Sequence, residues 1–403
     1  MLKLALRNIF RHRLRTGLTL AAIMAGVAVL ILSGGFIEDV FIQLREATIH
    51  SQLGHIQIYQ SGYFQYGRRD PYRYMISQAD PLVAEISAQP HAAQVMRRLN
   101  FFGLMTTGHA DVPIAGEAVE PAKEAHLGSA VTLIAGRMLT QDDHFGVMVG
   151  EGVAQALQLH PDDYVTLVLN TPEGALNSVD LRVIGVFRTM AMDYDAHAIR
   201  ITLEAARELL LTDAVHALVV MLDRTENTPA VVASLQQRLA GAGVEIKPWY
   251  ELADFYQKTV ELYRRQFAVL QIITLILVLL GVANSVNMAV YERTGEFGTL
   301  RALGNTPRQV GRLILTETIF LGLLGAIGGV LIALVLAAII SAIGIPMPPP
   351  PNMNGGYTAV IRLSTATVLS AFAVGIIATV LAALVPARRA ARMPVVEALR
   401  RNI

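Results

Sequence analysis

Residues that commonly carry catalysis are scarce or wrongly spaced in this sequence. It contains no cysteine, which removes thiolate nucleophiles and cysteine-based zinc sites. None of its lysines follows a glycine, so the G-x-x-x-x-G-K-[ST] phosphate-binding loop does not occur. The H-E-x-x-H and G-x-S-x-G motifs are absent too. These 403 residues therefore contain no P-loop ATPase, and we expect no catalytic or cofactor-binding residues among them.

Two short segments are rich in aspartate and histidine, HPDD at 160–163 and DYDAH at 193–197. Carboxylate and imidazole groups bind several divalent cations. Turns of this composition are also common on exposed surfaces, because aspartate bonds readily to the neighbouring backbone. We therefore predict solvated turns at both places and assign no metal site.

A short charged segment, residues 291–312, lies between two long apolar runs. Gly304 suits the position just after a helix C-terminus, and residues 306–309 (TPRQ) have the N-cap, N1 proline and N3 glutamine of a capping box. These signals predict a helix, a break and a new helix that starts at Pro307. The result would be a helical hairpin that can receive a push from a partner. A solvated connecting loop is the alternative.

Composition indicates the elements that position this segment. The chain is 53% hydrophobic and only 16% charged, with a mean hydropathy of +0.46, which is typical of a membrane protein. A transmembrane helix needs roughly 20 apolar residues. Four runs are long enough, at 17–37, 267–290, 313–345 and 363–385. The first is longer than the core of a cleaved signal peptide, so we expect a retained helix.

Basic residues predict the orientation. Arginines and lysines precede the first span without any acidic residue, and arginines recur in residues 291–312 and in the tail at 386–403. The loop at 346–362 holds a single arginine. Because basic residues concentrate in cytoplasmic loops, both termini and residues 291–312 are predicted to be cytoplasmic. Residues 1–16 combine apolar and basic helical stripes, which predicts an amphipathic helix in contact with membrane lipid.

Residues 38–266 have the pattern of a water-soluble α+β domain outside the cytoplasm, either one large domain or two lobes. Their excess of acidic over basic residues argues against nucleic acid as a partner. Strands are predicted at 55–59, 164–169, 181–187 and 217–222, and helices at 151–159, 203–211 and 229–240. Helical patterns without proline or glycine at both ends, 38–50 and 249–265, predict a rigid stalk.

Few polar residues interrupt the spans. Glu317 lies near the cytoplasmic end of the third, where we predict a helix-to-helix hydrogen bond that braces the hairpin; a proton relay is the alternative. Gly322, Gly325, Gly328 and Gly329 permit close packing in the same span, including packing against a second copy of the chain.

Several motifs resemble those of one family. They are LALRNIFRHRLRT at the start, YERTGEFGTLRALGNTPRQV after the second span, VPARRAARMPVVEALR at the end, and IAGRML, VMVGEGVAQALQL and LRVIGVF in the domain. In these and in its layout the chain resembles the MacB/FtsX-type permeases of ABC transporters, which include the lipoprotein-releasing permeases LolC and LolE. The resemblance implies four transmembrane helices per protomer and a two-lobed periplasmic α+β domain between helices 1 and 2. It also implies a multi-pass protein of the bacterial inner membrane.

The resemblance further implies partners and a function. A second permease copy or paralogue would complete a dimer, and a cytoplasmic ABC ATPase dimer would bind ATP and Mg. Glu292, Arg293, Glu296, Arg301 and Gly304 match the segment that couples to the ATPase. The chain lacks the ATPase domain of MacB, which favours lipoprotein or lipid release from the inner membrane. The alternatives are MacB-like efflux of a small molecule or peptide and FtsX-like regulation of a cell-wall hydrolase. A periplasmic lipoprotein carrier as partner would indicate lipoprotein release, an adaptor protein would indicate efflux, and a hydrolase would indicate regulation.

Overall fold

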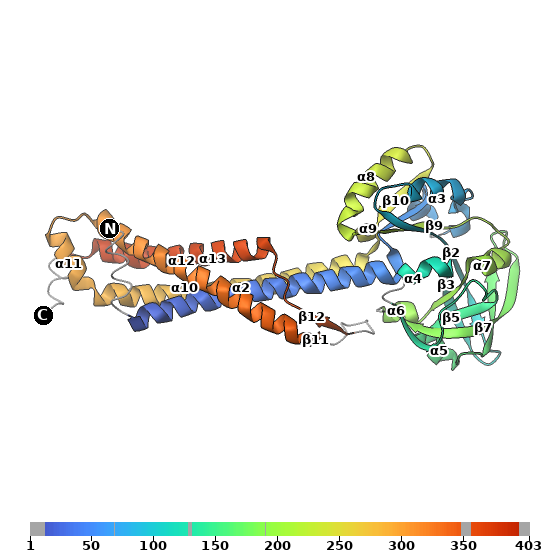
Figure 1. Cartoon of the computed structure of the whole chain (residues 1–403), viewed down its shortest axis with the longest axis horizontal. Coiled ribbons are helices and arrows are strands. Elements are labelled where there is room, and N and C mark those ends of the chain that lie inside the picture. Colours follow the sequence, from blue (N-terminus) through green and yellow to red (C-terminus); the bar gives the residue numbers. More distant parts are fainter. Residues whose placement is uncertain (1–12, 68, 128–130, 190, 348–355, 395–403) are drawn as a thin grey trace. The chain divides into compact units, whose positions relative to one another are not determined.

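The computed structural model describes the chain except for residues 1–12, 68, 128–130, 190, 348–355 and 395–403 (Figure 1). The predicted amphipathic helix at 1–16 falls mostly outside the described residues, as do the end of the tail and much of the loop at 346–362. The chain forms two compact units. One contains Met1–Ile42, Val260–Pro346 and Thr358–Ile403, and the other contains Gln43–Thr259 and Met347–Tyr357.

The first unit is built from four long apolar helices (Figure 1). They are α2 (Arg13–Thr48), α10 (Asp254–Glu292), α12 (Pro307–Ile343) and α13 (Thr365–Arg392). Each is long and apolar enough to cross a membrane, which agrees with the four predicted spans. The helices extend beyond the apolar runs, and α13 continues past residue 385 to Arg392.

Glycines set the contacts between these helices. A Cβ on Gly325 would lie 2.7 Å from a methyl carbon of Ile23, and one on Gly329 would lie 2.8 Å from the carbonyl oxygen of Met24. A Cβ on Gly322 would lie 3.1 Å from the methyl carbon of Thr379 in α13. Because a side chain at any of these positions would push neighbouring atoms away, the glycine face of α12 is used for packing against α2 and α13 within the protomer.

The second unit begins with a four-stranded antiparallel sheet in the order β10-β1-β9-β2. Helices α3 and α8 connect the strand pairs, so the lobe is a split βαβ arrangement of the ferredoxin-like kind (Figure 1). The elements are β1 (Ile56–Gln60), α3 (Ala79–Ser87), β2 (Ala92–Thr106), β9 (Ala217–Leu222), α8 (Thr228–Arg238) and β10 (Val244–Pro248).

The remaining strands close into a small barrel. In hydrogen-bonding order the ring runs β2-β3-β8-β5-β7-β6 and returns from β6 to β2. The strands are β3 (Asp111–Val119), β5 (Gly146–Gly150), β6 (Tyr164–Asn170), β7 (Leu176–Arg188) and β8 (Ala198–Thr202), with β4 (Thr132–Gly136) added on β7. The helices of this lobe are α4 (Pro121–Leu127), α5 (Glu151–Leu157), α6 (Met192–Asp195) and α7 (Leu203–Leu210).

Strand β2 belongs to both lobes. Its residues 92–98 pair with β9 in the sheet, and its residues 99–106 pair with β3 in the barrel. The barrel is therefore an insertion between two neighbouring strands of the first lobe, and the predicted α+β domain has two lobes. Each predicted strand and helix of this domain is present, with ends that shift by a few residues.

One predicted boundary is wrong. The uninterrupted pattern from residue 249 predicted one helix, but α9 (Trp249–Leu252) ends at Ala253 and α10 starts at Asp254. The cause is tertiary packing: Trp249 is buried against Ile49, Met96 and Val219, which fixes the short helix in place. No local sequence signal marks this break.

Candidate functional site

The charged segment between the second and third spans folds as a short helix followed by the start of α12. Helix α11 (Thr294–Ala302) ends in a Schellman motif, in which Asn305 N–H donates to Leu300 O and Gly304 N–H donates to Arg301 O, both at 3.1 Å. Gly304 has the positive φ of +97° that this motif requires. Both bonds of the predicted capping box at the start of α12 are present. The predicted helix, break and helix are confirmed.

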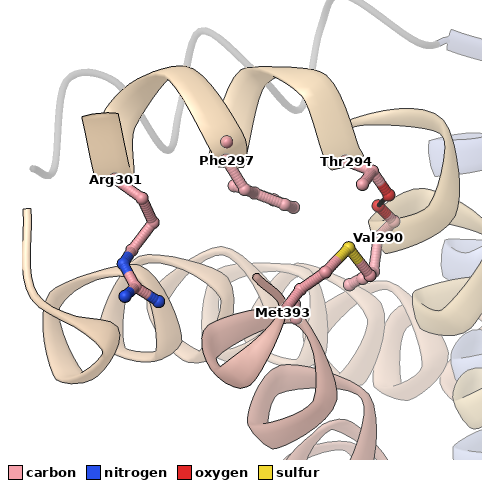
Figure 2. Close-up of a pocket in the computed structure, with 7 residues that line it drawn as sticks. Val290, Thr294, Phe297, Arg301 and Met393 are labelled. Carbon is pink, nitrogen blue, oxygen red and sulfur yellow. Dashed lines mark hydrogen bonds between the residues drawn. The ribbon is translucent and has the colours of Figure 1, made fainter. Parts of the chain in front are cut away.

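The inner face of α11 packs on the helical unit. Phe297 is buried with residues from the ends of α10, α12 and α13. Figure 2 shows Phe297, Val290 and Met393 around a small gap, with Arg301 at one end of the helix and Thr294 at the other. The aromatic ring holds α11 against the bundle by its apolar area.

A buried ion pair fixes the N-terminal end of α11. Arg293 Nη1 lies 2.6 Å from Glu317 Oε2 of α12, and Arg293 Nε lies 2.9 Å from Glu296 Oε2. Arg293 and Glu317 are each only 9% exposed. A buried charge needs such a partner, because an unpaired one is strongly unfavourable. Glu317 therefore braces the hairpin, as predicted.

A second contact fixes the other end. Arg301 Nη1 donates to the carbonyl oxygen of Ala391 in α13, at 2.8 Å. Arg293 and Arg301 thus tie α11 to two different helices of the unit. The structure shows that both hold α11 on the helical unit, and their predicted coupling to a partner stays a prediction.

The outer surface of this segment carries the remaining predicted residues. Glu292 is exposed, and Glu296 is partly exposed beside Arg293. Two apolar residues join them: Tyr291 is 64% exposed and Leu303 is 78% exposed. The sequence interpretation missed both. The sequence did contain a signal for them. An apolar side chain in a segment that is too polar to lie in hydrocarbon can be an exposed contact residue.

The first candidate metal segment, residues 160–163, is a turn as predicted, but the second prediction is wrong, because residues 193–195 belong to α6 and Asp195 is not solvated. Asp195 is buried and accepts hydrogen bonds from the backbone N–H and hydroxyl of Thr189. Asp163 accepts a bond from the backbone N–H of His160. Among the residues that the structure describes, no three His, Asp or Glu side chains are grouped as metal ligands.

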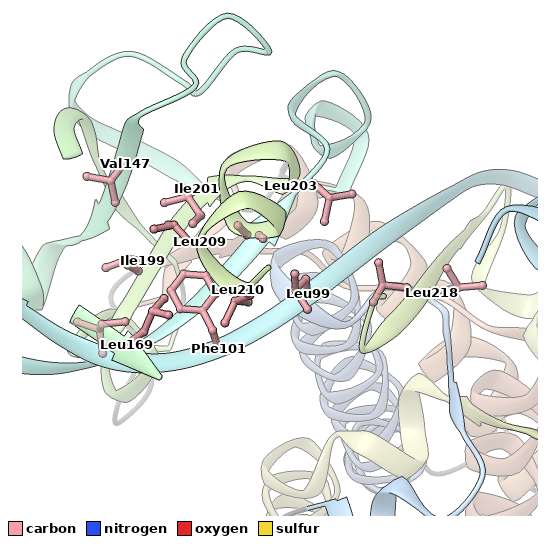
Figure 3. Packing of buried hydrophobic residues seen from close by; sticks show 14 of the residues in the cluster. Leu99, Phe101, Val147, Leu169, Ile199, Ile201, Leu203, Leu209, Leu210 and Leu218 are labelled. Atoms are coloured by element: carbon pink, nitrogen blue, oxygen red, sulfur yellow. The ribbon is translucent and has the colours of Figure 1, made fainter. Parts of the chain in front are cut away.

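A buried network of four charges joins the lobes of the α/β unit. Arg98 lies 2.7 Å from Glu124, and Arg200 lies 3.3 Å from Glu117. Arg98 belongs to β2, whose neighbouring residues Leu99 and Phe101 point into the barrel core (Figure 3). Burial alone would raise the pKa of Glu117, but the two arginines hold it below its ordinary value.

The same network reaches the segment that follows the first span. Arg200 Nη2 donates to the carbonyl oxygen of Ser51, at 3.2 Å, in a π-helical turn at Ile49–Leu53 directly after α2. Ile49 in this turn packs with Met96, Val219 and Trp249 of the first lobe. Both lobes therefore hold the end of this segment.

Two buried histidines predict how the α/β unit responds to pH. Burial lowers the pKa of His55 and of His216 to about 4 in each case. Both rings accept a backbone hydrogen bond, His55 from Leu222 and His216 from Asn100. Because the unfolded chain binds these protons near pH 6.5 and the folded chain does not, stability should fall as the pH drops from about 6.5 to about 4, by at most about 1.4 kcal/mol per pH unit for each histidine.

The measurement is urea unfolding of the full chain in detergent between pH 7.5 and 5, followed by the fluorescence of Trp249. This residue is the only tryptophan in the sequence and lies buried in the α/β unit. His55→Gln and His216→Gln should each flatten the pH profile, whereas the exposed His109→Gln should leave its slope unchanged. A flat profile in the wild-type protein would contradict the prediction.

These features define a class of protein. Four apolar helices, with an α/β domain between the first two and a braced helix between the next two, are the elements of a multi-span membrane protein. Residues 16–238 match the MacB-like periplasmic core domain, and residues 268–395 match the FtsX-like permease C-terminal domain. The chain therefore belongs to the MacB/FtsX-type ABC transporter permeases.

Individual relatives agree with this assignment. The lipoprotein-releasing system transmembrane protein LolC of Neisseria meningitidis is 25% identical, over 80% of this chain and 76% of LolC. The uncharacterized ABC transporter permease YvrN of Bacillus subtilis is 26% identical, over 99% of this chain and 98% of YvrN. The macrolide export ATP-binding/permease protein MacB of Psychrobacter cryohalolentis is 24% identical, over 99% of this chain and 59% of MacB.

Proposed function

We propose that this chain is a permease subunit that converts ATP hydrolysis on a separate cytoplasmic ATPase dimer into motion of its α/β domain. A second permease copy or paralogue completes the transporter. ATP and Mg bind to the partner subunits, and this chain supplies the surface on which the ATPase acts. Both termini and α11 lie on the cytoplasmic side, and the α/β domain lies on the other side of the inner membrane.

The braced helix α11 carries this proposal. A helix that transmits a push has to be attached firmly to the elements that it moves and has to present a surface to the element that pushes. Arg293 and Arg301 provide the attachment to α12 and α13. Glu292, Glu296 and Leu303 provide the outer surface. A solvated loop would need neither contact.

The α/β unit supports mechanical transmission from its own side. The turn after α2 is bonded to Arg200 and packed beside Trp249, so a displacement of this turn acts on both lobes. Such rigid elements suit a switch in which packed parts shift together. The apolar character of the four spans fits a transporter that needs no aqueous path through them.

For the substrate, we propose a lipoprotein or another lipidated molecule in the outer leaflet of the inner membrane. The permease would deliver it to a periplasmic carrier. The likeness to LolC over most of both chains supports this choice. Efflux of a small molecule or peptide through an adaptor protein is the second candidate, and the likeness to MacB along this whole chain favours it. Reconstituted vesicles separate the two, because only the first activity transfers a fluorescent lipidated peptide to a soluble acceptor.

The energy supply gives a direct test. The purified chain alone should hydrolyse no ATP above background, because its sequence contains no phosphate-binding loop. Hydrolysis should appear when a candidate ABC ATPase is co-expressed and co-purified with it. Phosphate release is measured for the permease alone, the ATPase alone and the complex. Turnover by the permease alone would overturn the proposal.

The orientation of the chain in the membrane gives a second test. Because the sequence has no native cysteine, an introduced cysteine is the only thiol that can be labelled. Ser61 and Thr299 are both exposed and lie in different units. Ser61→Cys should react with a membrane-impermeant thiol reagent in intact spheroplasts, and Thr299→Cys should react only after the membrane is opened. Labelling is read by a mass shift on the gel. Reaction of Thr299→Cys in intact spheroplasts would reverse the orientation.

A further inference from the structure

The outward face of α13 changes from apolar to basic near its C-terminal end. Ile377, Leu381 and Val385 are exposed at intervals of four residues along one side of the helix. Arg388, Arg389 and Arg392 continue the same side and are also exposed. The opposite side is lined with buried alanines such as Ala383 and Ala387 that pack on the other helices.

The three arginines line an open hollow of about 530 Å³ together with Val385 and Met393. In the described part of the chain, none of their guanidinium groups has a hydrogen-bond or ion-pair partner. This distinguishes them from Arg293 and Arg301, which are bonded to Glu317 and to the backbone of Ala391. The hollow therefore presents positive charge that no described residue of the chain offsets.

We propose that this hollow binds the phosphate headgroup of an anionic phospholipid. Guanidinium groups match phosphate oxygens in pairs, so three of them side by side favour an occupant with negative charge. The acyl chains would lie along Val385, Leu381 and Ile377, which are exposed in the apolar part of a predicted span. This continuous apolar stripe selects a lipid over a soluble acidic protein, since a soluble partner cannot follow the stripe into hydrocarbon.

The position also gives the lipid a structural consequence. Ala391, whose carbonyl oxygen receives Arg301 of α11, lies between Arg389 and Arg392 on the helix that binds the headgroup. A bound headgroup would reduce the mutual repulsion of the three arginines at the C-terminal end of α13, which is the helix bonded to α11. Lipid binding should therefore stabilise the attachment of α11 to α13.

Native mass spectrometry of the full chain in detergent tests the proposal. The probes are phosphatidylglycerol and phosphatidylcholine with identical acyl chains, and inorganic phosphate as a competitor at millimolar concentration. Wild-type protein should retain phosphatidylglycerol at least about tenfold more than phosphatidylcholine. The variant Arg388→Gln, Arg389→Gln, Arg392→Gln should lose this preference, whereas the control Arg308→Gln, Arg312→Gln, which removes two other exposed arginines, should keep it.

Four results would overturn the proposal. A triple variant that keeps the preference would show that the hollow is not the site, provided that its Trp249 fluorescence is unchanged. An equal loss in the control would show general attraction between charges. Displacement of the lipid by inorganic phosphate alone would assign the hollow to a free anion. A triple variant that loses ATPase binding and keeps lipid binding would assign this surface to the protein partner instead.

Discussion

Replacing Glu317 with leucine should destabilise the helical unit by about 3–5 kcal/mol, because it leaves the buried guanidinium of Arg293 without its main partner. The 2.6 Å contact between Arg293 and Glu317 would be lost, and the partly exposed Glu296 would be the only carboxylate that remains bonded to Arg293 among the described residues. The measurement is thermal unfolding of the full chain in detergent by circular dichroism, together with the protein fraction that stays monodisperse.

The double variant Arg293→Met, Glu317→Leu separates charge from packing. It removes both charges, so it should recover most of the lost stability, since an apolar pair of similar size often replaces a buried ion pair without cost. Glu261→Leu is the control, because Glu261 forms an exposed pair with Arg265 on α10 that should contribute less than about 1 kcal/mol. A Glu317→Leu variant as stable as the wild type would refute the bracing role.

Replacing Leu303 with glutamate should weaken ATPase binding without unfolding the permease. Leu303 is 78% exposed at the end of α11, so a charge there disturbs little within the chain. If the proposed coupling surface is correct, the leucine is buried in the ATPase groove, and a charge in that contact should cost about 2–4 kcal/mol, or roughly 30- to 1,000-fold in affinity. Binding of purified ATPase to immobilised permease measures this loss.

The matched control is Leu176→Glu, which places the same charge on an equally exposed leucine of the α/β unit. It should leave ATPase binding unchanged. Leu303→Glu is also a cleaner test than Glu296→Arg, because the latter would place a second guanidinium beside Arg293 and damage the brace itself. Wild-type ATPase binding by Leu303→Glu would remove α11 from the coupling surface.

Local signals in the sequence were sufficient for the hairpin. The glycine after α11 and the TPRQ capping box act within a few residues, so their pattern predicted both helix ends correctly. The inward orientation of the Arg293 side chain could not be predicted in this way, because its partner Glu317 lies 24 residues away on another helix. The exposure of Leu303 likewise depends on how α11 rests on the bundle.

The α/β domain shows the same limit more strongly. Strand β2 was missed because Arg97 and Arg98 interrupt its apolar alternation. These arginines are stabilised by ion pairs with carboxylates that include Glu120 and Glu124, which lie more than 20 residues away in the sequence. Neither the closure of the barrel nor the sharing of β2 between lobes leaves a pattern in the local sequence, since both are properties of strand pairing.

The shared strand also determines how the domain resists force. In an antiparallel pair the inter-strand hydrogen bonds run perpendicular to the strands. A force that pulls the lobes apart along the axis of β2 therefore acts in shear on the hydrogen bonds of β2 to β9 and to β3. In this geometry the bonds share the load and do not break one after another. The domain can consequently carry tension between its lobes through a single covalent strand, and we expect its first mechanical yield at the helices and turns around β2.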